Sequence, residues 1–557
     1  MEERIPKLFL MWKEYSKEQF IKDIVAGIIV AIIALPLSIA LALASGVSPE
    51  QGIYTAIVAG FVIAMLGGSR VQISGPTAAF ATIVAGIVAQ KGMAGLVAAT
   101  ILAGVILILM GVFKLGGLIK FIPYTIVTGF TSGIAVTIVI GQIKDFLGLE
   151  FKHAPIETME KLKECIDTIG TINAQALSVG LIALAILIVW PKINAKIPPS
   201  LIAVIVTIVL VKGLDMEVNT IGSLYEISNK LPVPSMPQFS LELIESVLPD
   251  AFTIAVLAAI ESLLSCVVSD GMIGDRHNPN VELIAQGAGN IASGIFGGIP
   301  ATGAIARTAA NVKNGGRTPI AGMVHSVVLL LILIVLMPYA ALIPMPAIAA
   351  ILFMVAYNMC GWREFVTLLK TAPKSDIFVL VTTFVLTVVF DLVVAIEIGF
   401  MLAVILFLKR MSDVADVRSW EYVEEEREGL RIVPKGTLVY ELEGPMFFAA
   451  ADKFLSVSAD KNTKVVILRM SDVPAMDVSA LRKLEEVYRS CKRKNITLIL
   501  SHVTEQPRRM MEKAGFVVDV GSENFCESIE TALRRAEQLC QKTKVRKKDV
   551  KMREETV

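Results

Sequence analysis

Twelve apolar segments of membrane-spanning length follow one another through the first 410 residues, and they constrain the fold more than any other feature. About 20 consecutive apolar residues suffice for a helix to cross the hydrocarbon core of a bilayer. The segments lie at 23–45, 51–67, 94–112, 121–143, 173–191, 198–213, 249–270, 279–297, 318–338, 344–361, 375–391 and 392–409. Hydrophobic residues make up 54% of the chain and charged residues only 18%, which excludes a soluble globular protein of this length. The sequence predicts a polytopic α-helical membrane protein.

Two further apolar pieces, at 76–90 and 303–312, are too short to cross a membrane alone. They belong to similar stretches, GGSRVQISGPTAAFATIVAG (67–86) and GGIPATGAIARTAANVKNGG (297–316), in which a glycine pair and an extended run precede a half-helix. With these pieces the count is fourteen, and spans one to seven repeat the order of spans eight to fourteen. Because seven is odd, the halves have opposite topology, as in the inverted repeats of secondary transporters. The N-termini of the two half-helices are therefore expected to meet near the midplane.

Such an arrangement would bind an anion without a basic side chain. The first turn of a helix leaves backbone N–H groups unpaired and carries about half a positive charge. Broken backbone is tolerated at membrane depth only where it lines a cavity or is buried in protein. One such break would fit a proline kink in a packed helix equally well, but two at matching places favour a substrate site.

Glu261, in LAAIESLLSCVVSD on the eighth span, is a carboxylate at membrane depth, where an acidic residue costs about 2.5–3.5 kcal/mol. A structural interpretation makes it the ion-pair partner of Arg307 in the second half-helix. A functional one makes it a proton-binding group beside the anion, because a carboxyl shielded from water favours its protonated form. Ser262 and Ser265 are expected to donate hydrogen bonds back to their own helix.

The distribution of basic residues sets the orientation. Connectors on the side of the termini carry residues such as Arg70, Lys114, Arg276 and Arg363, whereas the opposite short connectors carry little beyond Lys91. By the positive-inside rule both termini are cytoplasmic. The predicted parts are a cytoplasmic amphipathic N-terminus (1–22), a transporter domain (23–410), an α/β domain (430–541) and a basic disordered tail (542–557).

Several motifs resemble those of the sulfate permease family of anion transporters. They are QISGPTAAF (72–80), GFTSGIAVTIVIGQIKDFLGL (129–149), AAIESLLSCVVSDGM (258–272) and ATGAIARTAANVKNGGRTPI (301–320). The resemblance covers nearly the whole chain and implies seven plus seven inverted spans in a core and a gate domain. It places the substrate between the half-helices of spans three and ten, flanked by spans one and eight. The residues that it implies for the site are Pro36, Ser38, Ser74, Thr77, Ala78, Ser265, Thr302, Gly303 and Ala304, with Glu261 as the proton-coupling group.

Within the family the chain looks most like the bacterial C4-dicarboxylate branch, which implies proton-coupled symport of fumarate or succinate. It departs from the cyanobacterial sodium–bicarbonate transporters, which carry Asp at the Glu261 position and Thr at the Ser265 and Ile305 positions. Ile305 has no oxygen ligand for Na⁺, so the departure favours a proton as the coupling ion. The resemblance implies a bacterial plasma membrane location.

The region from 430 alternates strands and a helix. Three segments read as strands: GTLVYELEG, TKVVILRM and ITLILSHV. SALRKLEEVYRSCKRK, between the second and the third, reads as an amphipathic helix, and this alternation is typical of an α/β layer fold. It resembles the STAS domain, which sulfate transporters share with anti-sigma-factor antagonists. AMDVSAL (475–481) corresponds to the antagonists' phosphorylation segment, with Ser479 as the candidate regulatory residue, although the usual Asp-Ser-Ser/Thr-Gly run is altered. We interpret this domain as a regulatory and dimerisation module, and the chain as a homodimer.

Three functional hypotheses follow. The first is a proton-coupled anion symporter; the second keeps the fold but transports sulfate or bicarbonate, or exchanges anions without a proton. The third is a receptor whose membrane part signals through the STAS domain. The sequence offers no hydrolytic or redox constellation, so we expect no enzyme, and we predict no cofactor, metal or nucleic-acid partner. The six cysteines show no metal-binding spacing and are expected to be free thiols.

Overall fold

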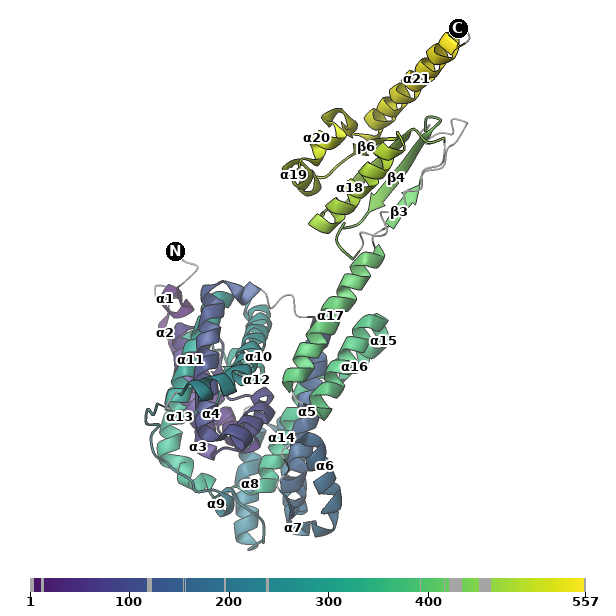
Figure 1. The fold of residues 1–557 in the computed structure, drawn as a ribbon. Coiled ribbons are helices and arrows are strands. Elements are labelled where there is room, and N and C mark those ends of the chain that lie inside the picture. The colour runs from purple at the N-terminus through teal and green to yellow at the C-terminus, as the bar shows by residue number, and fades with distance from the viewer. Residues whose placement is uncertain are drawn as a thin grey trace. The chain divides into compact units, whose positions relative to one another are not determined.

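The computed structural model describes residues 5–11, 15–117, 123–153, 155, 157–194, 197–236, 240–390, 392–414, 416–419, 433–449 and 462–554. The chain divides into two compact units, Met1–Met401 and Leu402–Val557 (Figure 1). The first has an extended core of Ala, Ile and Leu side chains contributed by most of its long helices. The second has separate apolar clusters on either face of a sheet.

The first unit is helical. Among its described residues, eight helical segments are long and apolar enough to cross a membrane. Its helices are α1 (Lys7–Met11), α2 (Lys17–Ala44), α3 (Pro49–Leu66), α4 (Ala78–Val112), α5 (Tyr124–Leu147), α6 (Thr158–Asp167), α7 (Ala174–Ile193), α8 (Pro199–Gly213), α9 (Ile221–Leu224), α10 (Leu241–Ile273), α11 (Pro279–Ile295), α12 (Ile305–Lys313), α13 (Pro319–Ala340), α14 (Met345–Cys360), α15 (Trp362–Thr371) and α16 (Lys374–Val389), and α17 (Leu392–Val414) continues into the second unit.

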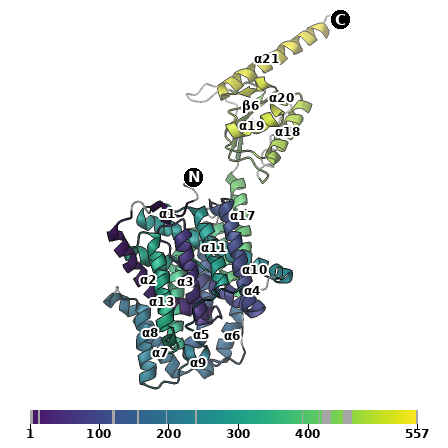
Figure 2. The same cartoon turned by 90° about the vertical axis from the view of Figure 1, so that its left-hand side faces the viewer.

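The helix packing follows an inverted repeat. α2 and α3 of the first half both pack on α13 of the second half. Their counterparts in the second half, α10 and α11, both pack on α4 of the first half. The pairs α3–α11 and α5–α14 join equivalent helices of the two halves. The helices α2–α4 and α10–α13 therefore form one group, and α5, α7, α8, α14 and α16 form a second. Figure 2 labels α3 and α11 of the first group and α7 and α8 of the second. These groups correspond to the core and gate domains of the predicted fold.

The 35-residue helix α4 is two helices joined at Gly92. Gly92 has φ +67° and ψ −173°, a conformation that L-residues with a Cβ rarely adopt. The segment from Ala78 to this break is the first half-helix, and the rest of α4 is a separate transmembrane helix. The second half-helix is α12, nine residues long.

Several helices extend beyond the apolar segments that the sequence marks. α2 begins at Lys17 and not at 23, because Ser16 caps it by accepting a hydrogen bond from the Gln19 N–H. α10 likewise begins eight residues before 249, capped by Ser240. Hydropathy detects only the part of a helix that lies in lipid, whereas these caps lie beyond it. The predicted N-terminal segment 1–22 therefore contains the start of α2, and its residues 1–4 and 12–14 lie outside the described part.

The described residues of the second unit contain a five-stranded sheet in the order β3-β4-β5-β6-β7. β4 (Thr437–Glu443), β5 (Val465–Asp472) and β6 (Thr497–Ser501) are parallel, as predicted for an α/β domain, and α18 (Val478–Arg493) connects β5 to β6. Two strands not predicted from the sequence complete the sheet: β3 (Asp416–Ser419), antiparallel to β4, and the short β7 (Phe525–Cys526). α19 (Glu505–Lys513) and α20 (Phe516–Val520) follow β6.

The C-terminal segment differs from the prediction. Residues 542–557 are predicted as a disordered tail, but the structure continues α21 (Ile529–Glu554) through them as far as Glu554. Lys, Arg and Glu are good helix formers, so a helix already fixed at Ala532 and Ala536 on the sheet can continue through a polar sequence. Residues 555–557, and parts of the predicted STAS region at 430–432 and 450–461, lie outside the described residues.

Candidate functional site

Two short strands hold the half-helices together. β1 (Ser74–Gly75) pairs antiparallel with β2 (Thr302–Gly303), immediately before the two half-helix N-termini. A long polar side chain lies close to a glycine at both crossings. A Cβ on Gly75 would lie 2.7 Å from Nη1 of Arg307, and one on Gly303 would lie 2.4 Å from Nε2 of Gln72. The two glycines therefore leave room for the side chains of Arg307 and Gln72 beside the crossing strands.

The N-termini of both half-helices lack a side-chain cap. Thr77 precedes α4 and Ala304 precedes α12, and neither side chain accepts a hydrogen bond from its own helix. Ala78 is buried at the α4 tip, whereas Ile305 and Ala306 are exposed in the first turn of α12. First-turn N–H groups and the positive ends of two helix dipoles therefore converge next to small side chains, which is a suitable environment for an anion.

Glu261 lies at the α4 tip. The Thr77 hydroxyl donates a hydrogen bond of 2.9 Å to Oε2 of Glu261, and the Glu261 side chain is only partly buried. Glu261 forms no ion pair with Arg307, so the purely structural interpretation of Glu261 finds no support in this conformation. A carboxylate that accepts from a cap residue compensates part of the positive charge at the helix terminus.

The neighbouring serines of α10 differ from expectation. Ser262 does not donate back to its own helix; its Oγ accepts from the Gly303 N–H at 3.0 Å and shares a hydrogen bond of 2.7 Å with the Thr302 hydroxyl. Ser265 contacts the Thr308 hydroxyl at 3.4 Å. The Ser262 hydroxyl thus supplies an acceptor for a backbone N–H of the adjacent strand, and its contact with Thr302 replaces a bond back to a helix carbonyl. α10 therefore fixes β2 and α12 as well as carrying Glu261.

Arg307 lies behind the crossing strands and is 1% exposed. Its Nη2 contacts Ser38 Oγ at 3.4 Å and the Pro76 carbonyl at 3.3 Å, and its Nε and Nη1 have no hydrogen-bond partner in the described part of the chain. A buried guanidinium without a carboxylate adds positive charge to the half-helix tips. Ser38 of α2 is therefore in contact with Arg307, whereas Pro36 is buried inside α2.

A ladder of polar side chains on α11 supports both strands, and the sequence analysis missed it. We call Glu282, Gln286, Asn290 and Ser293 the α11 ladder; all four are fully buried. Glu282 accepts from the Gly68 and Ser69 N–H groups and from Gln72 and Gln286.

Further along α11, the ladder reaches β1 and the residue before β2. Gln286 donates to Ser74 at 3.2 Å, and Asn290 exchanges two hydrogen bonds of 2.9 Å with the backbone of Ala301. The spacing of three to four residues, on one face of an apolar helix, is the signal that identifies such a ladder.

The structure thus brings most of the predicted residues together. Those that lie on the crossing strands, on the half-helix tips or on the adjoining face of α10 are Ser74, Thr77, Ala78, Glu261, Ser265, Thr302, Gly303 and Ala304. Ser479 belongs to the second unit, exposed at the second residue of α18, where Asp477 is the N-cap. No cluster of three or more His, Cys, Asp or Glu able to hold a metal ion occurs among the described residues.

Comparison with known proteins identifies the family. A sequence model of the sulfate permease family matches residues 20–383, and a model of the STAS domain matches residues 431–532. The chain belongs to the sulfate permease family. It is an anion transporter of that family with a multi-pass membrane domain. The proteins that it resembles are transporters and not enzymes.

Relatives across the family share most of the chain. The Bacillus subtilis (strain 168) protein named "Putative sulfate transporter YvdB" is 41% identical over 521 residues, 92% of this chain and 97% of that protein. The bicarbonate transporter BicA of Picosynechococcus sp. is 31% identical over 539 residues, 92% and 94% of the two chains. The names of these relatives refer to sulfate and bicarbonate, and none of them supports the C4-dicarboxylate branch that the sequence motifs suggested.

Solved structures agree with the fold. Murine Slc26a9 in the inward-facing state superposes with a TM-score of 0.87 at 18% identity, covering 96% of this chain and 94% of that chain. The transmembrane domain of a cyanobacterial bicarbonate transporter BicA superposes with a TM-score of 0.61 at 28% identity, covering 70% and 98%. The helical membrane domain and the STAS domain are thus both features of known anion transporters.

Proposed function

We propose that this protein imports a small oxyanion together with a proton, and that Glu261 carries the proton. The observation that supports this proposal is the hydrogen bond from Thr77 to Glu261 at an otherwise uncapped half-helix tip. An ionised Glu261 competes with a bound anion for the same positive helix terminus, because like charges repel. Protonation removes that competition, so anion and proton stabilise each other's binding by one coupling free energy.

Two features favour a proton over Na⁺. Ile305, the first residue of α12, offers no side-chain oxygen at the second half-helix tip, and Na⁺ sites are built from oxygen ligands. Glu261 is a titratable group that is both close to the tip and partly accessible. A proton needs only one such group.

For the substrate, we propose a compact inorganic oxyanion of the sulfate or bicarbonate class. The names of YvdB and BicA support this class, and so do the small side chains at the tips, Ala78, Gly303 and Ala304. C4-dicarboxylates, which the sequence motifs suggested, are the competing class. A second carboxylate about 4–5 Å away would need its own donors, and Arg307 is too deeply buried behind the strands to be the evident one.

The experiment is paired uptake into proteoliposomes. Labelled sulfate uptake is measured with and without an inward proton gradient and with and without Na⁺, and unlabelled bicarbonate, fumarate and succinate compete in the same assay. Accumulation that depends on the proton gradient and is indifferent to Na⁺ is the expected result. Stronger competition by fumarate or succinate than by bicarbonate would overturn the substrate class, and flux of none of these anions would favour the receptor hypothesis.

Glu261→Gln tests the coupling residue, because the amide mimics the protonated carboxyl. This variant is expected to exchange anion for anion but to lose accumulation driven by a pH gradient. Glu242→Gln, an exposed carboxylate in the first turn of the same helix, is the matched control and is expected to behave like the wild type. If Glu261→Gln still concentrates the anion after a pH jump, Glu261 does not carry the coupling proton.

Orientation and assembly belong to the same proposal. The basic connectors favour cytoplasmic termini in a bacterial plasma membrane, which leaves the STAS domain in the cytoplasm. We propose that the STAS domain helps to hold a homodimer and that Ser479 is a regulatory site. A phosphate on Ser479 would lie at the N-terminus of α18 but beside the carboxylate of Asp477, so its effect would depend on the balance of attraction and repulsion.

A further inference from the structure

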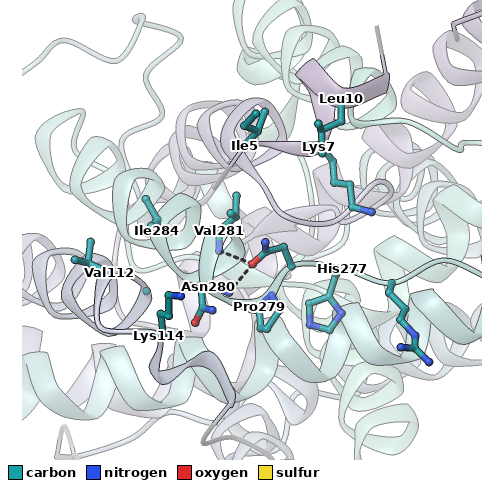
Figure 3. A pocket seen from close by; sticks show the side chains of 13 residues that line it. Ile5, Lys7, Leu10, Val112, Lys114, His277, Pro279, Asn280, Val281 and Ile284 are labelled. Atoms are coloured by element: carbon teal, nitrogen blue, oxygen red, sulfur yellow. Dashed lines mark hydrogen bonds between the residues drawn. The ribbon is translucent and has the colours of Figure 1, made fainter. Parts of the chain in front are cut away.

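A basic pocket lies away from the half-helices, at the junction of α1, the end of α4 and the start of α11. Figure 3 shows the side chains that line it, and its volume is about 490 Å³. The lining consists of Ile5, Lys7, Leu10, Gly111, Val112, Lys114, Arg276, His277, Asn278, Pro279, Asn280, Val281 and Ile284. None of these residues has a role in the anion site described above.

The lining is positively charged. Lys7, Lys114 and Arg276 are basic, and no carboxylate occurs among the lining residues that the structure describes. Two described carboxylates pair with the lining: Asp270 contacts Nδ1 of His277 at 2.7 Å, and Asp275 is shared between Lys7 at 3.1 Å and Arg70 at 3.3 Å. The single charge of Asp275 therefore faces two basic residues, and the side chain of Arg276 is exposed at the pocket, as is that of Lys114. The charge of the pocket matches an anionic ligand.

The pocket also has an apolar wall at the end of a transmembrane helix. Leu10 and Val112 are 41% and 50% exposed, and Phe113 beside them is 69% exposed. Large apolar side chains left open at the end of a membrane-spanning helix lie at the depth of lipid glycerol and headgroups. A soluble phosphate would use the basic residues but gain nothing from this wall.

We propose that this pocket binds the phosphate headgroup of an anionic membrane lipid, with the acyl chains along the apolar wall. Basic pockets between transmembrane helices are suited to such headgroups. The lipid would connect α1 to α11, and both are tied to the loop before β1: the Lys7 N–H donates to the Gly67 carbonyl, and Glu282 accepts from the next residue, Gly68. The proposal concerns binding and does not depend on proton coupling at Glu261.

Native mass spectrometry of the purified chain in detergent tests the proposal with phosphatidylglycerol and phosphatidylcholine as probes. Wild-type protein is expected to retain phosphatidylglycerol preferentially. The double variant Lys114→Gln/Arg276→Gln is expected to bind it roughly 30-fold more weakly, from the loss of two basic contacts near the membrane surface. The control Lys370→Gln/Lys374→Gln removes two exposed charges of α15 and α16 and should retain the lipid.

Two further arms keep the test decisive. Val112→Glu places a carboxylate on the exposed wall without removing a basic residue, and it should also reject phosphatidylglycerol; folding of each variant is checked by gel filtration and thermal melting. Glycerol phosphate and inorganic phosphate, added in place of phosphatidylglycerol, test whether a soluble ligand binds as well as the lipid. Equal retention of phosphatidylglycerol by the wild type and both pocket variants would overturn the proposal. So would a rise in the melting temperature of the wild type with inorganic phosphate alone that equals the rise with phosphatidylglycerol.

Discussion

Glu282→Gln is the substitution that most directly tests how the α11 ladder supports the anion site. Oε2 of Glu282 accepts from the N–H groups of Gly68 and Ser69 at 2.9 and 3.1 Å, and Oε1 accepts from Nε2 of Gln72 and Gln286 at 2.8 and 2.9 Å. The side chain is 0% exposed, so water does not replace a lost partner. Glutamine preserves the volume but turns one of the two acceptor oxygens into a donor.

The magnitude follows from these contacts. Whichever way the new amide points, its NH₂ group faces two donors, so two of the four hydrogen bonds are lost. Hydrogen bonds to a charged group contribute about 1.5–3 kcal/mol each, so the loss is about 3–6 kcal/mol. Reorientation of the Gln286 amide would recover one bond but sacrifice its contact to Ser74, which leaves a net loss near the lower end of that range.

The assay is a denaturant titration of the protein in detergent, combined with sulfate uptake in liposomes. Glu282→Gln is expected to lower the unfolding midpoint strongly and to raise the KM for the anion, since Gly68 and Ser69 lead into β1. Glu364→Gln, which alters an exposed carboxylate of α15, should change neither. An unchanged midpoint for a fully buried Glu282→Gln variant would show that the four hydrogen bonds do not hold the loop in place.

Three further substitutions test other parts of the protein. Ala304→Trp is expected to abolish uptake while leaving the folded state intact, because the side chain would fill the space before the α12 tip; near-normal transport would refute this position for the anion. Asp477→Ala removes a carboxylate that accepts from Ala480 N–H at 2.8 Å and Phe448 N–H at 2.9 Å, and it should destabilise the STAS domain by about 1–2 kcal/mol in chemical denaturation. Truncation after Val414 should reduce the dimer fraction measured by mass photometry but preserve the transport pathway, and an unchanged dimer fraction would count against the proposed role of the STAS domain.

Local rules allowed the broken half-helices to be recognised in the sequence. Glycine pairs, Pro76 and the two short apolar runs departed from the pattern of a continuous span, and they did so at matching places in both halves. The parallel strands and α18 of the STAS domain were equally evident, because a buried strand and an amphipathic helix have different hydrophobic periods. In each case the signal lay within a few residues of the element that it predicted.

The interactions that join distant segments were not predictable in this way. Glu282 contacts residues more than two hundred positions away, and Ser262 bonds β2 and not its own helix. The sequence offered Arg307 as an ion-pair partner of Glu261, but only the packed fold places it behind the strands next to Ser38. Such contacts depend on the register of β1 against β2, which no local pattern encodes.

The two half-helix tips are related by the inverted repeat but differ in charge, and this difference would allow the proposed site to respond to both an anion and a proton. The α4 tip is connected through Thr77 to a carboxylate that can change its charge, whereas the crossing strands are backed by the fixed positive charge of Arg307. Two identical dipole tips would attract an anion at every pH. Because an ionised Glu261 cancels part of that attraction, the affinity for the anion is expected to fall as Glu261 ionises and to persist where it is neutral. Glu261→Gln should therefore bind the anion with an affinity that no longer depends on pH, while Arg307 continues to supply attraction in both forms.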